Sequence, residues 1–433
     1  MEESSIAREA TSRVPAKHRK KDALTQEATA EKHGEASLER LYPQLKARRN
    51  VSREQVAAHQ RTRLHAAMIE ACARKGYAAT TVNDVVKLAG TSKKTLFVHF
   101  GSKEECFLAT YDLAVREAAA RVSTAYRARP DEERDWAAGL CRAFDAFVAE
   151  LVEHPRTARI GLVDILAAEA GATERIERTE AIFAWMFNRS FAQAPDGTSM
   201  PPALLRSLLG GIWFVARVHL MEGNPEEIAG SGELFRDWIL SYHSPLAREV
   251  PLTVPVPSLR GEAAPEWRRR NGRNPEPLVT RLEWICAEAL AYAVRASEGA
   301  PTWAASTCRA VTAIYRCIAT DEEFASAAFG EALAAGPEVA EYRIALLRGF
   351  ATAFARRVPP DQRPDPLIAE ATIGAIWSIA HRCALNRTLN QLPALAGQAS
   401  FLALAPVVGA EQALETIREE LLGGGSGQPA IAI

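Results

Sequence analysis

Apolar residues recur every three or four positions along most of the chain, which is the spacing of one face of an α-helix. The first such run begins at Val56 and continues through Cys72. The sequence S-R-E-Q, which starts at Ser52, is a capping box that can close the first turn of a helix. Gly76 ends the run, because glycine disfavours a helix interior. The pattern therefore predicts a long helix that ends near Lys75.

Two short helices and a second long one are predicted next. Thr81 can cap a helix that runs through Leu88, and Gly90 then supplies the backbone freedom for a tight turn. Ser92 opens a short helix with the sequence KKTLFVHF, and the capping box S-K-E-E at Ser102 opens a long helix. Short helices joined by a glycine turn are typical of a helix-turn-helix.

The rest of the chain also has a helical pattern, and it contains an internal repeat. The string WAAGLCRAF at Trp136 recurs as WAASTCRAV at Trp303, 167 positions later. The string GGIWFVARV at Gly210 recurs as GAIWSIAHR at Gly374, 164 positions later. Ordered matches with nearly constant offsets indicate a duplicated helical domain. The predicted fold class is all-α.

Charge is distributed unevenly along the 433 residues. The chain is 48% hydrophobic and 24% charged, and its 52 basic and 53 acidic residues give a net charge of −1. Residues 46–105 hold 12 basic and 5 acidic side chains, a net charge of +7, whereas residues 1–45 hold 8 of each. The remainder holds 32 basic and 40 acidic side chains, a net charge of −8. A cationic module on an acidic body is typical of a domain that binds a polyanion.

The first 45 residues contain few large apolar side chains, so burial cannot offset the entropy of ordering them. We expect a disordered charged arm. Its KHRKK cluster, Lys17 to Lys21, could contact phosphates, or it could be a solvated charge run.

Cysteine usage and hydropathy predict a cytoplasmic protein. The seven cysteines show no CxxC motif and no Cys/His cluster with metal-ligand spacing, so we expect buried thiols in a reducing compartment. The N-terminus lacks an apolar signal segment. The longest apolar stretch, around FLALAPVVGA, is far shorter than the ~20 residues that span a bilayer. We therefore expect no membrane partner.

Motifs of the common enzyme classes are missing from the sequence. It contains no P-loop, no GxGxxG after a strand, no GxSxG and no HExxH. A metal site in a helical bundle would need paired Glu-x-x-His motifs. The nearest cluster, Glu150 with Glu153 and His154, occurs only once. We expect no catalytic residue, no metal site and no cofactor.

The third predicted helix has the composition of a recognition helix. Such a helix presents short polar and cationic side chains at its N-terminal end to base edges and phosphates, and it packs its apolar face on the preceding helices. Leu96 and Phe100 provide the apolar face. The polar set comprises Ser92, Lys93, Lys94, Thr95 and His99. The alternative is an ordinary solvated hairpin whose lysines have no ligand.

The segment GYAATTVNDVVKLAGTSKKTLFVHFGSKEECF, Gly76 to Phe107, resembles the DNA-binding segment of the TetR (tetracycline-repressor) family of transcriptional regulators. The likeness extends from Arg61 to about Tyr111 and combines G-[YF], T-[TV], A-G-x-S, T-L-[YF]-x-H-F and S-K-E in order. The resemblance implies a sequence-specific regulator of transcription that binds double-stranded DNA, a repressor released by a small apolar or amphipathic effector. The alternative is a constitutive DNA-binding assembly scaffold without an effector pocket.

The resemblance also assigns contacts with DNA. Positions that commonly contact the DNA backbone match Thr81, Thr95, Phe97, His99 and Lys103. Those closest to the bases match Ser92, Lys93 and Lys94. Phe97 replaces the usual Tyr, which loses a hydroxyl–phosphate bond, and Lys94 replaces a common Gly, which adds a charge at the groove.

The patterns divide the chain into six segments, and the resemblance implies their roles. They are a disordered charged arm (1–45), a helix-turn-helix DNA-binding domain (46–106), a first regulatory domain for ligand binding and dimerisation (107–250), a Pro-rich linker (251–277), a second regulatory-like domain (278–422) and a flexible tail (423–433). The resemblance further implies a location in the cytoplasm, on the nucleoid.

Aromatic residues of the first regulatory domain could line an effector cavity, although a helical aromatic stripe is more often plain core. The candidate ligand-binding residues are Trp136, Trp185, Trp213 and Arg217. In the repeat, Trp213 is equivalent to Trp377 and Arg217 to His381.

Small residues in the helices around Gly210 and Gly374 allow close backbone approach. In the family, the corresponding helices join two protomers in a four-helix bundle; internal packing within one domain is the alternative. The 27-residue linker spans on the order of 30 Å, so the two copies can meet within one chain. We expect an intramolecular pseudo-dimer or, failing that, a homodimer.

Overall fold

The computed structural model describes residues 52–128, 136–168, 171–194, 200–244, 277–320, 327–331 and 337–422. The predicted arm with its Lys17–Lys21 cluster, nearly all of the predicted linker and the predicted tail lie outside the described residues. Within the described ranges the chain forms helices and no strand, which confirms the all-α fold class. The described residues form two compact units, which meet in the chain between Thr110 and Tyr111.

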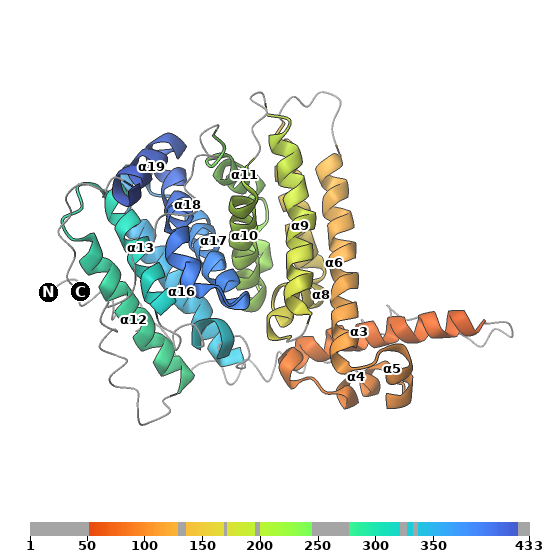
Figure 1. The fold of residues 1–433 in the computed structure, drawn as a ribbon. Coiled ribbons are helices and arrows are strands. Elements are labelled where there is room, and N and C mark those ends of the chain that lie inside the picture. The colour runs from red at the N-terminus through yellow and green to blue at the C-terminus, as the bar shows by residue number, and fades with distance from the viewer. Residues whose placement is uncertain are drawn as a thin grey trace. The chain divides into compact units, whose positions relative to one another are not determined.

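The first unit is a helix-turn-helix domain. Its helices are α3 (Arg53–Ala79), α4 (Val82–Ala89), α5 (Lys93–His99) and the start of α6 (Lys103–Arg127) (Figure 1). Capping boxes close α3 at Ser52 and α4 at Thr81, and the Ser92 hydroxyl caps α5 by accepting a hydrogen bond from the Thr95 N–H at 3.1 Å. At the start of α6, the Ser102 hydroxyl accepts from the Glu105 N–H at 3.0 Å, as a capping box requires. The Glu105 carboxylate accepts from the Gly101 N–H and not from the expected Ser102 N–H.

Two glycines set the turns of this domain. Gly76 has φ 78° and breaks the helical geometry of α3, so the last residues of α3 form a separate turn beyond the predicted end at Lys75. Gly90 has φ 57° and ends α4 in the left-handed conformation that glycine adopts without strain. These breaks allow α3, α4 and α5 to pack on one another. The fully buried side chains between them include Leu64, Met68, Cys72, Val85 and Leu96.

The second unit begins within α6 and contains two successive sets of helices. The first set is α7 (Ala138–Glu153), α8 (Pro155–Leu162), η1 (Asp164–Ala167), α9 (Ala172–Phe191), α10 (Pro202–Glu222), η2 (Pro225–Ile228) and α11 (Gly232–Leu240). The second set is α12 (Leu278–Ser297), α13 (Trp303–Thr320), η5 (Ala327–Glu331), α16 (Pro337–Arg357), η6 (Pro360–Gln362), α17 (Pro366–Leu385), η7 (Leu389–Leu395), α18 (Ala396–Val408), α19 (Ala410–Ile417) and η8 (Arg418–Leu422).

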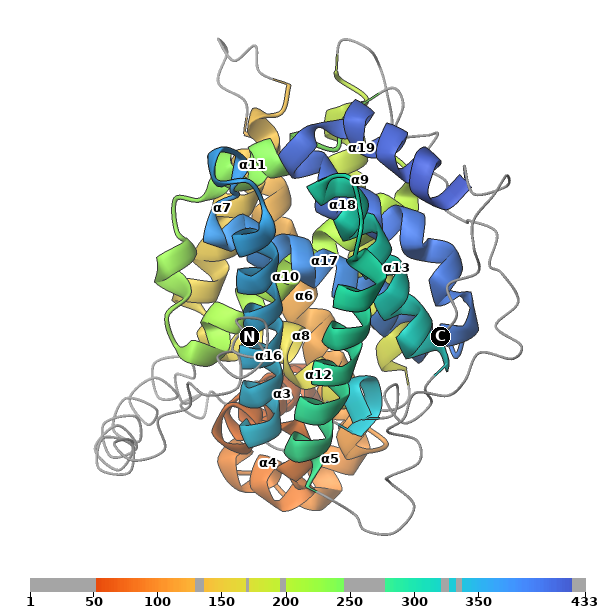
Figure 2. The same cartoon turned by 90° about the vertical axis from the view of Figure 1, so that its left-hand side faces the viewer.

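Helices α10 and α17 form the most extensive helix–helix contact of the second unit, and they lie side by side in Figures 1 and 2. Neighbouring hydrogen bonds join the same two sets of helices. The Trp238 indole N–H donates to the Thr372 hydroxyl at 3.2 Å, and the Tyr242 hydroxyl donates to the Leu402 carbonyl at 2.9 Å. One hydrophobic core contains buried residues from both sets, such as Leu208 and Ala375.

Two helical stretches are long and apolar enough to cross a membrane by length and composition, contrary to the sequence-based expectation. They are Pro202–Glu222 and Leu389–Val408, and 67% of each apolar window is buried inside the protein. Such burial is typical of core helices in a globular fold. All seven cysteines are free; Cys141 is half-buried and the other six are buried.

Candidate nucleic-acid interface and cavity

Helix α5 presents its two lysines to solvent. Lys93 and Lys94 form the first turn after the Ser92 cap and are exposed, whereas Leu96 on the opposite face is fully buried. The Ser92 and Thr95 hydroxyls lie 3.0 Å apart across the cap. The structure therefore brings the base-facing candidates together at one end of a short, firmly packed helix.

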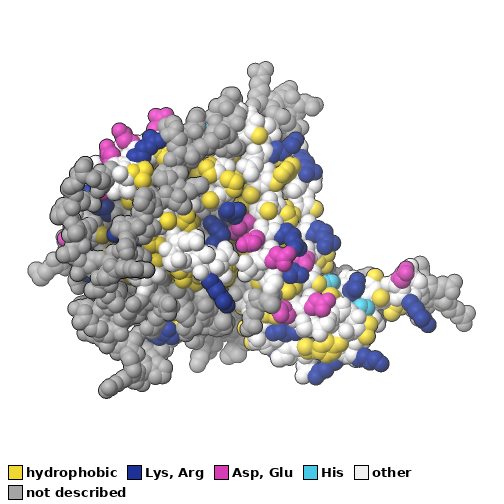
Figure 3. Space-filling view, viewed as in Figure 1, with side chains coloured by type: hydrophobic (Ala, Val, Ile, Leu, Met, Phe, Trp, Pro, Cys, Tyr) yellow, Lys and Arg dark blue, Asp and Glu magenta, His cyan; other side chains and the backbone are white. Residues whose placement is uncertain are grey.

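Two apolar side chains of α5 are also exposed. Phe97 is 50% exposed and Val98 is 71% exposed, the largest value among the exposed hydrophobic side chains of the described residues. Figure 3 shows Lys and Arg side chains (dark blue) close to apolar ones (yellow) on the helix-turn-helix domain. An apolar side chain beside cations can contact a sugar or a thymine methyl in a DNA groove. Our sequence reasoning did not identify Val98, because periodicity does not reveal that no helix covers this position.

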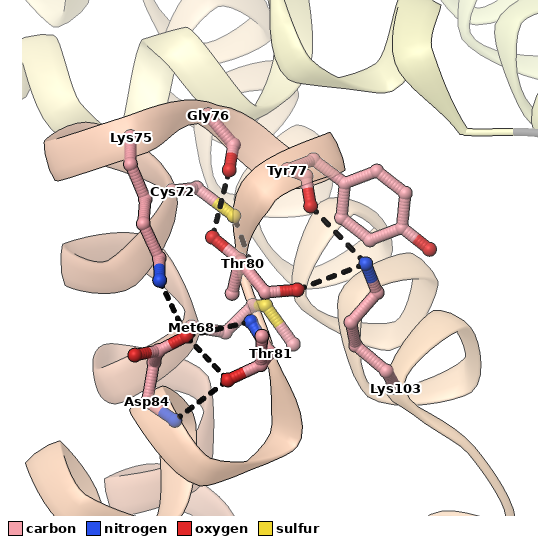
Figure 4. A network of polar contacts seen from close by, with 9 residues as sticks. All are labelled: Met68, Cys72, Lys75, Gly76, Tyr77, Thr80, Thr81, Asp84 and Lys103. Atoms are coloured by element: carbon pink, nitrogen blue, oxygen red, sulfur yellow. Dashed lines mark hydrogen bonds and ion pairs between the residues drawn. The ribbon is translucent and has the colours of Figure 1, made fainter.

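A polar network fixes the turn before α4. The Asp84 carboxylate accepts from the Thr81 N–H at 2.7 Å and from the Thr81 hydroxyl at 2.5 Å, and it forms an ion pair with Lys75 at 2.6 Å (Figure 4). The hydrogen bonds from Lys75 and Thr81 hold the pKa of Asp84 well below its usual value. Thr81, a candidate phosphate contact, is exposed, and its hydroxyl already serves this cap.

Lys103 at the start of α6 occupies a defined position. Its ammonium donates to the Tyr77 carbonyl at 3.2 Å and to the Thr80 carbonyl at 3.0 Å, and it lies 4.1 Å from the centre of the Tyr77 ring (Figure 4). Both carbonyls belong to the turn that follows Gly76. Lys103 therefore joins α6 to the end of α3, a role that the sequence did not reveal.

His99 and Arg63 make further contacts between the helices. The His99 Nε2 lies 2.9 Å from the Gln60 side-chain oxygen, and burial lowers the pKa of this imidazole. The Arg63 guanidinium donates to the Gly90 carbonyl at 3.2 Å and so holds the helix-turn-helix corner against α3. Sequence reasoning missed Gln60 and Arg63 as partners, since their spacing along α3 does not indicate what lies opposite.

The second unit contains a cavity with a volume of about 140 Å³. Its walls come from α6, α7, α8, α9 and α10 of the first set of helices and from α17 of the second. Two of the four predicted ligand-binding residues, Trp213 and Arg217, line it. Their repeat equivalents Trp377 and His381 line the same cavity.

The other two candidates lie elsewhere. The Trp136 ring packs against Phe191 and His243, at 5.7 Å and 5.4 Å between ring centres. Trp185 is 44% exposed and lies between the guanidinium groups of Arg127 and Arg189, each 5.5 Å from its ring. Neither tryptophan lines the cavity.

Charged groups line the cavity as well as apolar ones. Both carboxylate oxygens of Glu150 accept hydrogen bonds from the Arg121 guanidinium, so Glu150 is part of an ion pair. Arg382 lies 3.4 Å from Glu180, and burial raises the pKa of that carboxyl group. Among the described residues no group of three His, Cys, Asp or Glu side chains could hold a metal ion.

Comparison with known proteins identifies the first unit. Residues 64–110 match the model of the family described as "Bacterial regulatory proteins, tetR family". No curated protein matched the chain. The match spans the end of α3, the whole of α4 and α5 and the first turns of α6, which are the segments that build the interface described above. Residues 64–110 are therefore the helix-turn-helix domain of a transcriptional regulator of the TetR family.

Proposed function

We propose that this DNA-binding transcriptional regulator is a cytoplasmic repressor that a small-molecule effector releases from its operator. The observation that carries the DNA-binding part is the first turn of α5, where Lys93 and Lys94 are exposed beyond a capped N-terminus. In a helix-turn-helix, this end of the recognition helix contacts base edges in the major groove.

The proposed contacts divide into two classes. Ser92, Lys93 and Lys94 contact bases. Thr81, Thr95, Phe97, His99 and Lys103 contact the sugar-phosphate backbone. The exposed Val98 supplies apolar contact beside them. The Lys103 ammonium already donates to two carbonyls, which leaves one of its three N–H donors for a phosphate, whereas Lys93 and Lys94 have no partner among the described residues.

The two sets of helices in the second unit form, in our proposal, an intramolecular pseudo-dimer of regulatory domains. A methyl group added at Gly210 would meet Ser378, and one added at Gly374 would meet Phe214. Because 210 and 374, and likewise 214 and 378, are related by the repeat offset of 164, these two contacts are reciprocal. Reciprocal contacts of equivalent residues are the mark of a two-fold interface.

The cavity supports the effector part of the proposal. It is lined by Trp213 and Trp377 from the two facing helices and by α6 residues from Tyr111 to Arg121. The same helix, α6, begins at Lys103, and the Lys103 side chain donates a hydrogen bond to the turn after α3. Suppose that the protein has two conformations that differ in the placement of α6. An effector that binds one of them more tightly shifts the DNA-binding equilibrium by the difference between its two binding free energies.

The DNA-binding proposal is tested by selecting binding sites from a random duplex pool and then titrating the selected site. The preference is the difference in binding free energy between the selected site and random DNA. In the double variant Lys93→Ala, Lys94→Ala we expect this difference to fall by about 1–3 kcal/mol for each good base contact that is removed. Lys103→Ala should weaken binding to both DNAs about equally and reduce the salt slope by about 1.

Lys87→Ala is the matched control, since it removes an exposed cation from α4 in the same domain. It should leave the site preference unchanged. If the double variant binds the selected site and random DNA as the unmodified protein does, the assignment of α5 as the recognition helix is wrong.

A further inference from the structure

The cavity of the second unit has an excess of positive charge. Five side chains that carry a formal charge line it: Arg121, Glu150, Glu180, Arg217 and Arg382. Arg121 pairs with Glu150, and Arg382 lies beside Glu180. Arg217 is the third arginine of the lining, and it has no acidic partner among the described residues. Its Nε donates to the Leu162 carbonyl at 2.6 Å, which fixes the guanidinium without neutralising it.

A second buried guanidinium strengthens this excess. Arg343 on α16 is only 8% exposed, and its Nε has no hydrogen-bond partner. Burial lowers the pKa of Arg343 to about 10 and that of Arg217 to about 9, with Arg343 as a further cause of the latter. Both groups therefore stay charged at neutral pH, and each remains costly to bury unless an anion is nearby.

His381 contributes a polar group without adding to the charge. Its Nε2 is buried and has no partner, and it lines the same cavity. Burial and then the charges of Arg343 and Arg217 lower the pKa of this imidazole to about 3. A neutral imidazole can donate to or accept from a bound polar group. Besides the guanidinium of Arg217, the cavity lining thus offers buried polar atoms without a hydrogen-bond partner on His381, Trp377 (the indole N–H) and Glu180 (one carboxylate oxygen).

Most of the remaining lining side chains are apolar or aromatic. They include Phe147, Leu151, Ile165, Phe183, Trp213 and Trp377. The volume of about 140 Å³ is close to that of an engineered cavity of ~150 Å³ that binds benzene. The space therefore suits a body about the size of one aromatic ring.

We propose that this cavity binds a small apolar carboxylate, with the carboxylate paired to Arg217 and the ring-sized body between Trp213 and Trp377. The formal charges of the lining, three cations against two carboxylates, leave a positive surplus that the carboxylate of the ligand offsets. A guanidinium binds a carboxylate through two parallel hydrogen bonds. Because Trp377 and His381 come from the second set of helices, the ligand contacts both halves of the repeat.

The assignment rests on the proposed function only in naming this ligand as the effector; the binding site itself can be tested without DNA. The probes are benzoate and phenylacetate, which each have one aromatic ring, and each is compared with its amide, which has a similar shape and no charge. Binding to the full chain is measured by calorimetric titration and by the shift in melting temperature. We expect each acid to bind roughly 10- to 100-fold more tightly than its amide.

Three variants separate charge from shape. Arg217→Gln should bind acid and amide alike, and Arg217→Lys should keep part of the preference for the acid. Arg178→Gln is the control, because it removes an exposed cation of α9 that does not line the cavity. It should keep the full preference.

Equal binding of acid and amide by the unmodified protein would overturn the assignment, and so would the absence of binding by every probe at millimolar concentration. These two outcomes do not depend on the folding of any variant. An unchanged preference in Arg217→Gln would also overturn it. If the acids bind through Arg217 but leave DNA binding unchanged, the anion site stands and the effector mechanism fails.

Discussion

At the residue scale, the sequence predicted which residues cap the short helices, but it did not predict the hydrogen bonds that other parts of the chain make to the turns. Thr81 and Ser92 cap α4 and α5 as their positions before short apolar runs indicated. The bonds from Lys103 to the Tyr77 and Thr80 carbonyls could not be predicted, because they depend on how the chain turns after Gly76. Local hydrogen bonds follow from spacing, whereas contacts between distant residues require the fold.

Asp84 provides a prediction at this scale. Its carboxylate has a pKa below the ordinary 3.8 in the folded protein, mainly because it accepts hydrogen bonds from Lys75 and Thr81. A lowered pKa stabilises the fold above the ordinary value, and this contribution is lost as the pH falls below it. Asp84→Asn should therefore lower the melting temperature at neutral pH, and the difference from the unmodified protein should shrink between about pH 5 and about pH 3.

Thermal unfolding across that pH range provides the measurement. Asp361→Asn is a suitable control, because Asp361 is an exposed carboxylate of η6 with no ion pair among the described residues. A difference between the Asp84 variant and the unmodified protein that stays constant down to pH ~3 would show that the carboxylate charge plays no part.

At the scale of elements, the repeat pattern indicated which helices contain equivalent residues. It aligned Gly210 with Gly374, and the structure packs the helices that carry them, α10 and α17, against each other. It could not separate cavity residues from core residues, since Trp136, Trp185 and Trp213 all lie in helical or near-helical segments with similar patterns. Of these three, only Trp213 lines the cavity, where its ring lies 6.2 Å from that of Phe183 on α9, another lining residue.

The α10–α17 contact gives the next prediction. Gly210→Ala and Gly374→Ala each place a methyl group against Ser378 or Phe214, where the neighbouring atoms must move. Overpacking of this kind should destabilise the second unit by about 1–3 kcal/mol. Chemical denaturation of the free protein measures the loss.

Gly161→Ala in α8 is the matched control, since a methyl group there meets nothing within 4 Å. It should be neutral or slightly stabilising, because alanine favours a helix more than glycine does. Full stability in both the Gly210 and Gly374 variants would mean that the two helices do not pack closely in solution.

At the scale of the whole molecule, our proposal combines one helix-turn-helix with two regulatory domains. The matched helix-turn-helix lies at residues 64–110, and the predicted linker between the copies is too short and too Pro-rich to hold another. A symmetric operator requires two recognition helices one helical turn apart. We therefore expect two chains to associate on such an operator, or one chain to bind a half-site weakly.

The mass of the free protein in solution, measured by light scattering at low micromolar concentration, tests the pseudo-dimer most directly. In our account the faces of α10 and α11 that would join two protomers are already covered by α17 and α18 of the same chain. The account predicts a monomer of 47.2 kDa. A stable species of twice that mass in the absence of DNA would contradict it.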